Sequence, residues 1–176
     1  TESTYNGWQQ KPGVTVKDVK GKILRNGSDY TVFYQKDMKN VGTYVVTVSF
    51  KGNYSGKTEM NFNINPKGTS ISKVKPGKKG FELKWKKQSS QTTGYEIAYS
   101  TSSKFLKKNT KTLTIKKSKT TSKTVSKLKA KKKYYVRIRT YKIVKVNGKS
   151  TKLYSVWSKV KTFKTKNEKI DGNRMI

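Results

Sequence analysis

The chain has 176 residues, with 42 lysine and arginine residues against nine acidic ones, a net charge of +33, and neither cysteine nor histidine. This inventory excludes disulfides, zinc sites of the Cys/His kind, Ser-His-Asp triads and Cys-His dyads. No apolar run reaches the ~18 residues that a membrane helix needs. The sequence therefore predicts a protein with no cofactor, no membrane span and no catalytic equipment.

The positive charge is concentrated in the later part of the chain. Residues 1–67 contain ten basic and five acidic residues, which gives +5. Residues 68–167 contain thirty basic and two acidic residues, which gives +28. A distribution this uneven predicts attraction to polyanions and says little about the fold.

The first part of the chain consists of short apolar alternations separated by turn sequences. A period of two over a few residues predicts strands, and Asn-Gly or Gly-Asn pairs between them predict tight turns. Strands are expected at 14–16, 30–34, 44–50 and 60–64, with turns at 20–22, 26–27, 40–42 and 52–53. Strands recurring about every ten residues predict a β-sandwich over residues 1–67.

Several segments of this part are similar to a known family. The pieces YNG, VTVKDVKGK, GSDYTVFY, KNVGTYVVTV and GNYSG resemble bacterial immunoglobulin-like repeats from surface proteins of Gram-positive anaerobes. The resemblance implies an immunoglobulin-like domain that acts outside the cell. The segment INPKGTS follows it, and Pro66 and Gly68 should end the strand pairing there and form a short linker.

The second part, residues 68–167, contains seven predicted strands followed by a tail. The most regular one alternates Tyr134, Val136, Ile138 and Thr140 on one face with Tyr135, Arg137, Arg139 and Tyr141 on the other. The strands are expected at 71–75, 81–85, 95–99, 112–115, 124–128, 134–141 and 155–163. Residues 168–176 show no periodicity and are expected to be a frayed tail.

Several characteristic residues of this part resemble those of fibronectin type III domains. They are Trp85, Tyr95, Leu128, Tyr134 and the Trp157-Ser158 pair, and the Lys-rich context is similar to repeats from secreted proteins of clostridia. The resemblance implies a second β-sandwich with a tyrosine corner formed by Leu128 and Tyr134. The predicted fold class is therefore all-β, with tandem immunoglobulin-like and fibronectin type III-like sandwiches.

The outward face of the 134–141 strand is the first candidate site. Arg137 and Arg139 project on the same side, about 7 Å apart along the strand. The resemblance to cytokine-receptor modules implies that the Trp157 ring lies between them. The strand on the other side offers Glu96, the only acid within reach, as a cross-strand partner, which would complete a structural ladder. The alternative is a platform for a sugar ring formed by Trp157 with Tyr135 and Tyr141.

The lysine excess is the second candidate site. A functional interpretation is binding to teichoic acid, sulfated glycans or nucleic acid, driven by release of counterions. The plainer interpretation is a solvated surface that protects strand edges from aggregation. The candidate contacts are Lys129, Lys131, Lys132, Lys133, Lys159, Lys161 and Lys164.

A paired-carboxylate mechanism has one possible pair of residues. Glu82 and Glu96 are the only acids of residues 68–167. They fall on strands expected in opposite sheets, out of phase with the apolar faces, so they should point away from each other. Glycosidases need roughly 5 to 10 Å between such groups. The pair is therefore expected to be exposed charge.

Together these features predict a non-enzymatic, extracellular spacer, stalk or adhesion segment of a larger bacterial surface or secreted protein. One alternative is a polyanion-binding module in the Lys-rich second part. Another is a pair of accessory domains beside an enzyme whose catalytic part lies outside this chain. The expected partner is an unidentified protein or polysaccharide, including anionic polymers of the cell wall or host, and the segment is expected to be monomeric.

Overall fold

The computed structural model describes residues 1–167, and the predicted tail at 168–176 lies outside them. It confirms the all-β expectation, with one 3-10 turn at Lys107–Asn109 as its helical element in this range. The chain divides into two compact units. The first comprises Thr1–Lys67 and Lys142–Leu153, and the second Gly68–Tyr141 and the described residues 154–167. The sequence had placed 142–153 with the second part.

The first unit is built on one four-stranded sheet in the order β1-β4-β3-β2. β1 runs parallel to β4, and the other pairs are antiparallel. Its buried side chains are Leu24, Tyr30, Met38, Val46, Val48, Phe62 and Ile64. The strands are β1 (Glu2–Thr4), β2 (Tyr30–Tyr34), β3 (Gly42–Phe50) and β4 (Lys57–Asn65).

The expected strand at 14–16 is not a regular strand, and backbone pairing here is confined to a tight turn over residues 16–24. The Leu24 N–H donates to the Val16 carbonyl at 2.9 Å, the Asp18 N–H donates to the Lys22 carbonyl at 3.0 Å, and Lys17 and Ile23 form an isolated bridge. The Asp18 carboxylate accepts hydrogen bonds from the backbone N–H groups of Lys20 and Lys22, both at 2.9 Å, and so holds the turn. Val14 still packs on the core.

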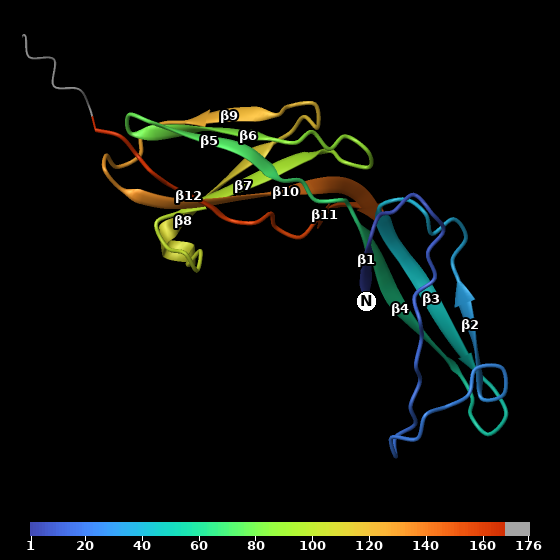
Figure 1. The fold of residues 1–176 in the computed structure, drawn as a ribbon. Coiled ribbons are helices and arrows are strands. Elements are labelled where there is room, and N and C mark those ends of the chain that lie inside the picture. The colour runs from blue at the N-terminus through green and yellow to red at the C-terminus, as the bar shows by residue number, and fades with distance from the viewer. Residues whose placement is uncertain (168–176) are drawn as a thin grey trace, which may run out of the picture. The chain divides into compact units, whose positions relative to one another are not determined.

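The second unit is a two-layer sandwich, and Figure 1 shows its two sheets one above the other. The three-stranded sheet has the order β5-β6-β9. The larger sheet has the order β11-β10-β7-β8, with β12 also paired to β10, and its residues 142–153 (the end of β10 and most of β11) are counted with the first unit. The strands are β5 (Ile71–Gly77), β6 (Gly80–Trp85), β7 (Gly94–Ser100), β8 (Thr110–Ile115), β9 (Ser122–Val125), β10 (Lys133–Val146), β11 (Lys149–Tyr154) and β12 (Lys161–Lys164).

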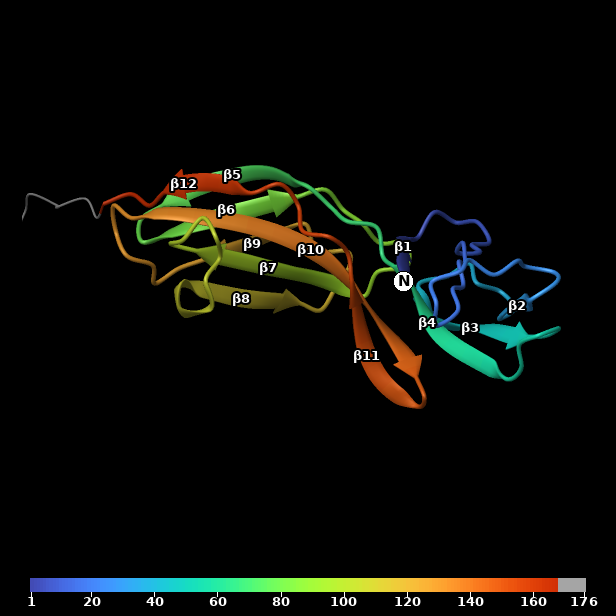
Figure 2. The ribbon, with the colours of Figure 1, turned by 90° about the horizontal axis from the view of Figure 1, so that it is seen from below.

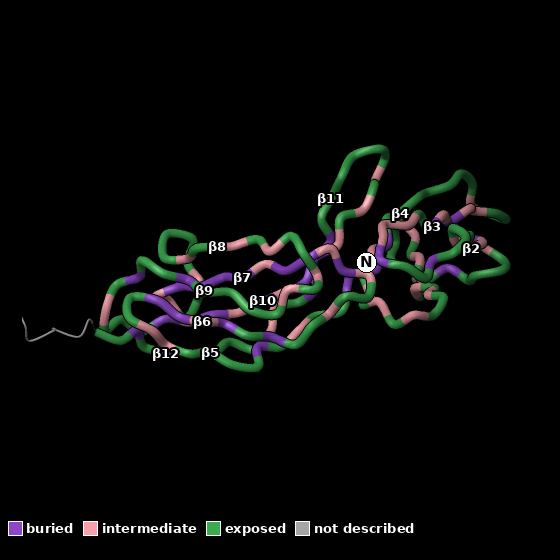
Figure 3. Tube along the Cα trace, turned by 90° about the horizontal axis from the view of Figure 1, so that it is seen from above, coloured by how far each residue is buried: buried purple, intermediate pink, exposed green. Residues whose placement is uncertain are grey.

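Burial in this unit follows the alternation of the sequence. Tyr134, Val136, Ile138 and Thr140 of β10 are buried, and Figure 3 shows buried stretches of tube next to exposed ones in this unit. Tyr134, Val136 and Ile138 pack with Phe81, Leu83, Trp85, Tyr95, Ile97, Val125 and Phe163 from both sheets. An eight-residue period-two pattern thus places its apolar face in the core, as expected for a central strand.

β10 continues well past the predicted end at Tyr141. Asn147 and Gly148 both have positive φ, of 49° and 77°, at the turn into β11. Two successive residues with positive φ are typical of a type I′ hairpin turn, for which Asn-Gly is the favoured pair. Figure 2 shows β10 and β11 as this hairpin.

Candidate functional site

The outer face of β10 places Arg137 and Arg139 on either side of Trp157. The guanidinium carbons lie 4.4 Å and 4.3 Å from the indole ring centre. Both arginines face out of the sheet because they alternate with the buried Val136, Ile138 and Thr140. The indole is therefore held between two cations, at distances well within the range of a cation–π contact.

Two more aromatic rings extend this stack at its ends. Phe105 lies 4.0 Å from the guanidinium carbon of Arg137, and Tyr154 lies 3.7 Å from that of Arg139. We call the resulting set the ladder: Phe105, Arg137, Trp157, Arg139 and Tyr154. Sequence reasoning missed both end rings, since Phe105 stands in a loop without periodicity and Tyr154 stands three residues before Trp157.

Glu96 supplies the negative charge beside the ladder. It is the register partner of Arg139 across β7 and β10, and the Arg139 Nε donates to its Oε1 at 2.8 Å. The pKa of Tyr154 is raised by burial and then by the nearby Glu96 carboxylate, to which its hydroxyl is hydrogen-bonded. Burial, then the adjacent Arg139, lowers the pKa of Arg137.

Two serines hold Trp157 beside β10, and the first part of the strand expected at 155–163 does not form. The hydroxyls of Ser155 and Ser158 accept hydrogen bonds from the backbone N–H groups of Thr140 and Ile138, both at 3.0 Å. The serine N–H groups in turn donate to the carbonyls of the same two residues. Because side-chain oxygens take the place of backbone carbonyls, regular pairing resumes only at β12.

The structure does not assemble the alternative sugar platform. Tyr141 is only 2% exposed, and a Cβ on its register partner Gly94 would lie 3.0 Å from its hydroxyl. Trp157 has a guanidinium group against each face. Sugar rings stack on a free aromatic face, and neither ring offers one.

The predicted tyrosine corner residues lie at one end of the second unit. Tyr134 and Leu128 are both buried, and the Tyr134 hydroxyl accepts a hydrogen bond from the Lys129 N–H at 3.3 Å. The Leu128 N–H donates to the Lys79 carbonyl at 2.7 Å. These contacts tie the β9–β10 loop to the body of the sandwich.

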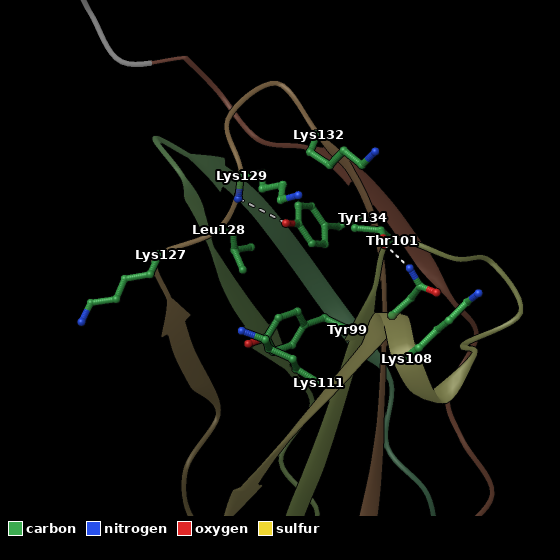
Figure 4. A pocket seen from close by; sticks show the side chains of 10 residues that line it. Tyr99, Thr101, Lys108, Lys111, Lys127, Leu128, Lys129, Lys132 and Tyr134 are labelled. Carbon is green, nitrogen blue, oxygen red and sulfur yellow. Dashed lines mark hydrogen bonds between the residues drawn. The ribbon is translucent and has the colours of Figure 1, made fainter.

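A cavity of about 390 Å³ opens beside this corner. Figure 4 shows it between the β9–β10 loop and the segment before β8. We call it the lysine cavity, after the five lysines among its lining residues Tyr99, Thr101, Lys108, Asn109, Lys111, Lys127, Leu128, Lys129, Lys132 and Tyr134. Burial raises the pKa of Tyr99 in its wall.

Only part of the predicted lysine set lines this cavity. Lys129 and Lys132 do, whereas Lys131, Lys133, Lys159, Lys161 and Lys164 are not among its lining residues. The Lys133 ammonium instead lies 5.4 Å from the Tyr135 ring centre. Lys108, Lys111 and Lys127 line the cavity without having been predicted; they come from the 3-10 turn at Lys107–Asn109, the start of β8 and the loop after β9.

The two glutamates are separated as expected. Glu82 lies on β6, 3.5 Å from the Lys84 ammonium, and Glu96 lies on β7 in the other sheet. Within residues 1–167 there is no cluster of three or more acidic side chains that could hold a metal ion. No helix in the same range is long and apolar enough to cross a membrane.

A family profile of the fibronectin type III domain matches residues 64–161, more than half of the chain. The chain belongs to the fibronectin type III domain family. Such domains are generally non-catalytic spacer or adhesion modules, and they usually occur in extracellular proteins. The match covers Trp85, Tyr134 and Trp157, which carried the resemblance in the sequence.

Two solved structures align with part of the chain at low sequence identity. The FN1–FN3 domains of chicken CNTN1 align with 76% of this chain at 15% identity and a TM-score of 0.49. A β-1,2-glucanase from Parabacteroides distasonis aligns with 71% at 13% identity and a TM-score of 0.42. This chain covers 46% and 18% of those two chains. No curated protein sequence matches it.

Proposed function

We propose that this chain is a non-catalytic spacer or adhesion segment of a larger protein that is secreted by, or displayed on, a bacterial cell. Its fibronectin type III membership and its lack of histidine and cysteine support a non-catalytic role. The sequence resemblance of residues 1–67 to bacterial immunoglobulin-like repeats from surface proteins favours the same setting. We expect two folded domains joined near residue 67.

The observation that carries the spacer role is the parallel pairing of β1 with β4. Glu2, Ser3 and Thr4 are paired with Asn63, Ile64 and Asn65. Because the strands are parallel, the chain enters β1 at one end of the pair and leaves β4 at the other end. Tension along the chain therefore slides the two strands past each other and loads their hydrogen bonds together.

Backbone hydrogen bonds extend this pairing at both ends. The Tyr5 N–H donates to the Asn65 carbonyl at 2.8 Å, and the Asn63 N–H donates to the Thr1 carbonyl at 3.1 Å. An antiparallel pair pulled from one end would instead open one bond at a time. A segment that transmits force without unfolding benefits from the parallel arrangement, in which the hydrogen bonds are loaded together.

The second unit has a smaller version of the same arrangement. Lys78, just after β5, forms a parallel bridge with Lys166, just after β12. The Lys166 N–H donates to the Gly77 carbonyl at 2.9 Å. Force spectroscopy on the chain held by its two ends tests the proposal, and we expect the first unit to lose resistance when residues 1–4 are removed.

A second candidate function is binding of an anionic polymer through the second unit. The charge of +28 over residues 68–167, most of which belong to this unit, and the lysine cavity favour this candidate. Binding that arises from surface charge alone should have a Kd of about 10⁻⁴ to 10⁻⁶ M and weaken steeply with added salt. No feature of the described residues favours the accessory-domain alternative.

A further inference from the structure

We propose that the lysine cavity is a discrete binding site for the sulfate or phosphate ester groups of an anionic polysaccharide. The proposal deepens the second candidate function and rests on it. It assigns the binding to one end of the second unit, where Lys108, Lys111, Lys129 and Lys132 line one cavity together with Tyr99 and Tyr134.

The charge of the lysine cavity is unbalanced. Five lysines line it, and none of its lining residues is acidic. Glu82 and Glu96, the only acids of residues 68–167, are engaged with Lys84 and Arg139 respectively. Like charges gathered in a concave site raise the local positive potential, and a bound anion relieves the repulsion between them.

The β9–β10 wall of the cavity is held in place by the Thr165 hydroxyl. This oxygen accepts a hydrogen bond from the Lys132 N–H at 3.0 Å and donates to the Lys129 carbonyl at 2.6 Å. The two lysines therefore start from a fixed backbone. Pre-organised groups lose less freedom on binding than groups on a mobile loop.

The opposite wall is fixed by the ladder. Phe105 stacks on Arg137 and anchors the segment that carries Lys108. The Ser100 hydroxyl donates to the Asn109 carbonyl at 3.0 Å, and the Asn109 amide donates to the Thr101 hydroxyl at 3.3 Å. Figure 4 shows Lys111 beside Tyr99, Lys129 and Lys132 near Tyr134, and Lys127 extending away from both rings.

The size and lining of the cavity favour a sugar ester over a nucleic acid. A volume of about 390 Å³ is close to the lower end of the range for small-molecule pockets and can hold one charged sugar unit. Single-stranded nucleic acids bind along grooves in which successive bases stack on exposed aromatic rings. Tyr134 is buried, and Figure 4 shows both tyrosine rings in the wall.

The test is isothermal titration of the full-length chain at physiological salt with three probes: inorganic tripolyphosphate, a sulfated heparin oligosaccharide, and a DNA oligonucleotide of matched charge. The site variant replaces Lys111, Lys129 and Lys132 with glutamine. The matched control replaces Lys116, Lys117 and Lys119, exposed residues beyond the other end of β8, with glutamine. Both variants lose three charges.

We expect the site variant to weaken binding of the sulfated oligosaccharide or of tripolyphosphate at least about tenfold more than the control does. A selective loss of oligosaccharide binding indicates a sulfate-bearing ligand, and a selective loss of tripolyphosphate binding indicates a phosphate-bearing one. Lys111→Arg with Lys129→Arg and Lys132→Arg should keep the affinity within about threefold, which separates lost charge from lost folding.

Three results overturn the proposal. Equal weakening in the site variant and the control would assign binding to the whole surface and leave the second candidate function standing. DNA bound as tightly as the sugar at equal charge would contradict a sugar-ester site. Absence of binding by the unmodified chain would remove the site and the second candidate function together, while the spacer role would be unaffected.

Discussion

Replacing Trp157 with alanine removes the centre of the ladder. The indole contacts Arg137 on one face and Arg139 on the other. Each contact contributes about 0.5–1 kcal/mol when exposed and about 2 kcal/mol when desolvated. The ladder is partly buried, so the two contacts together should contribute about 2 kcal/mol, and lost packing of the ring adds about 1 kcal/mol.

We therefore expect Trp157→Ala to lower the free energy of unfolding of the second unit by about 2–3 kcal/mol. For a domain of this size, each kcal/mol corresponds to roughly 4–8 °C in Tm. Urea unfolding followed by far-ultraviolet circular dichroism measures the change. The matched control is Trp8→Ala, because Trp8 is 76% exposed and its removal should cost less than about 0.5 kcal/mol.

A double-mutant cycle isolates the stacking contribution. Combining Trp157→Ala with Arg137→Ala should give a coupling energy of about 1 kcal/mol, since the two side chains share a contact. Arg137→Lys keeps the charge and loses the planar group, so it should recover only part of that energy. A coupling energy near zero, or a Trp157→Ala protein as stable as the wild type, would refute a structural role for the ladder.

Three further predictions concern other parts of the fold. Gly94→Ala should destabilise the second unit by about 2–3 kcal/mol, because the new Cβ would lie 2.0 Å from the Ile115 carbonyl oxygen. Urea unfolding measures this loss, and an unchanged unfolding midpoint would contradict it. The pKa of Tyr154 is raised, so its protonated form is favoured in the folded state, and the stability that this contributes is lost as pH rises above about 10. Tyr154→Phe should flatten this alkaline loss in thermal melts, and an equally steep loss in the variant would assign it elsewhere. Residues 68–167 expressed alone should unfold in one cooperative transition, and an aggregated or unfolded product would count against the proposed domain boundary.

Alternation of side chains made the core of the second unit predictable. A period of two placed Val136 and Ile138 inside and Arg137 and Arg139 outside, and the structure has the same faces. The same regularity places Glu96 opposite Arg139 once β7 and β10 are paired. The period of two follows from the geometry of the strand backbone, so the faces of a strand can be assigned from a single sequence.

Contacts made by loops were not predictable in this way. Phe105 reaches Arg137 from a segment without periodicity, and Lys108 reaches the lysine cavity from the 3-10 turn that follows it. Ser155 and Ser158 replace backbone pairing with their hydroxyls, which no alternation rule describes. The hairpin after Tyr141 did have a readable signal, because Asn147-Gly148 is the preferred pair for such a turn.

The most direct measurement of the spacer role is single-molecule force spectroscopy of the chain tethered at its two ends, with and without residues 1–4. These residues contain β1, so their removal deletes the parallel partner of β4 and leaves the other strand pairs in place. We expect two unfolding events in the full chain, and a marked fall in the rupture force of one of them after the deletion. Unfolding forces that are the same in both chains, or a full chain that extends without a distinct rupture, would contradict the proposed function.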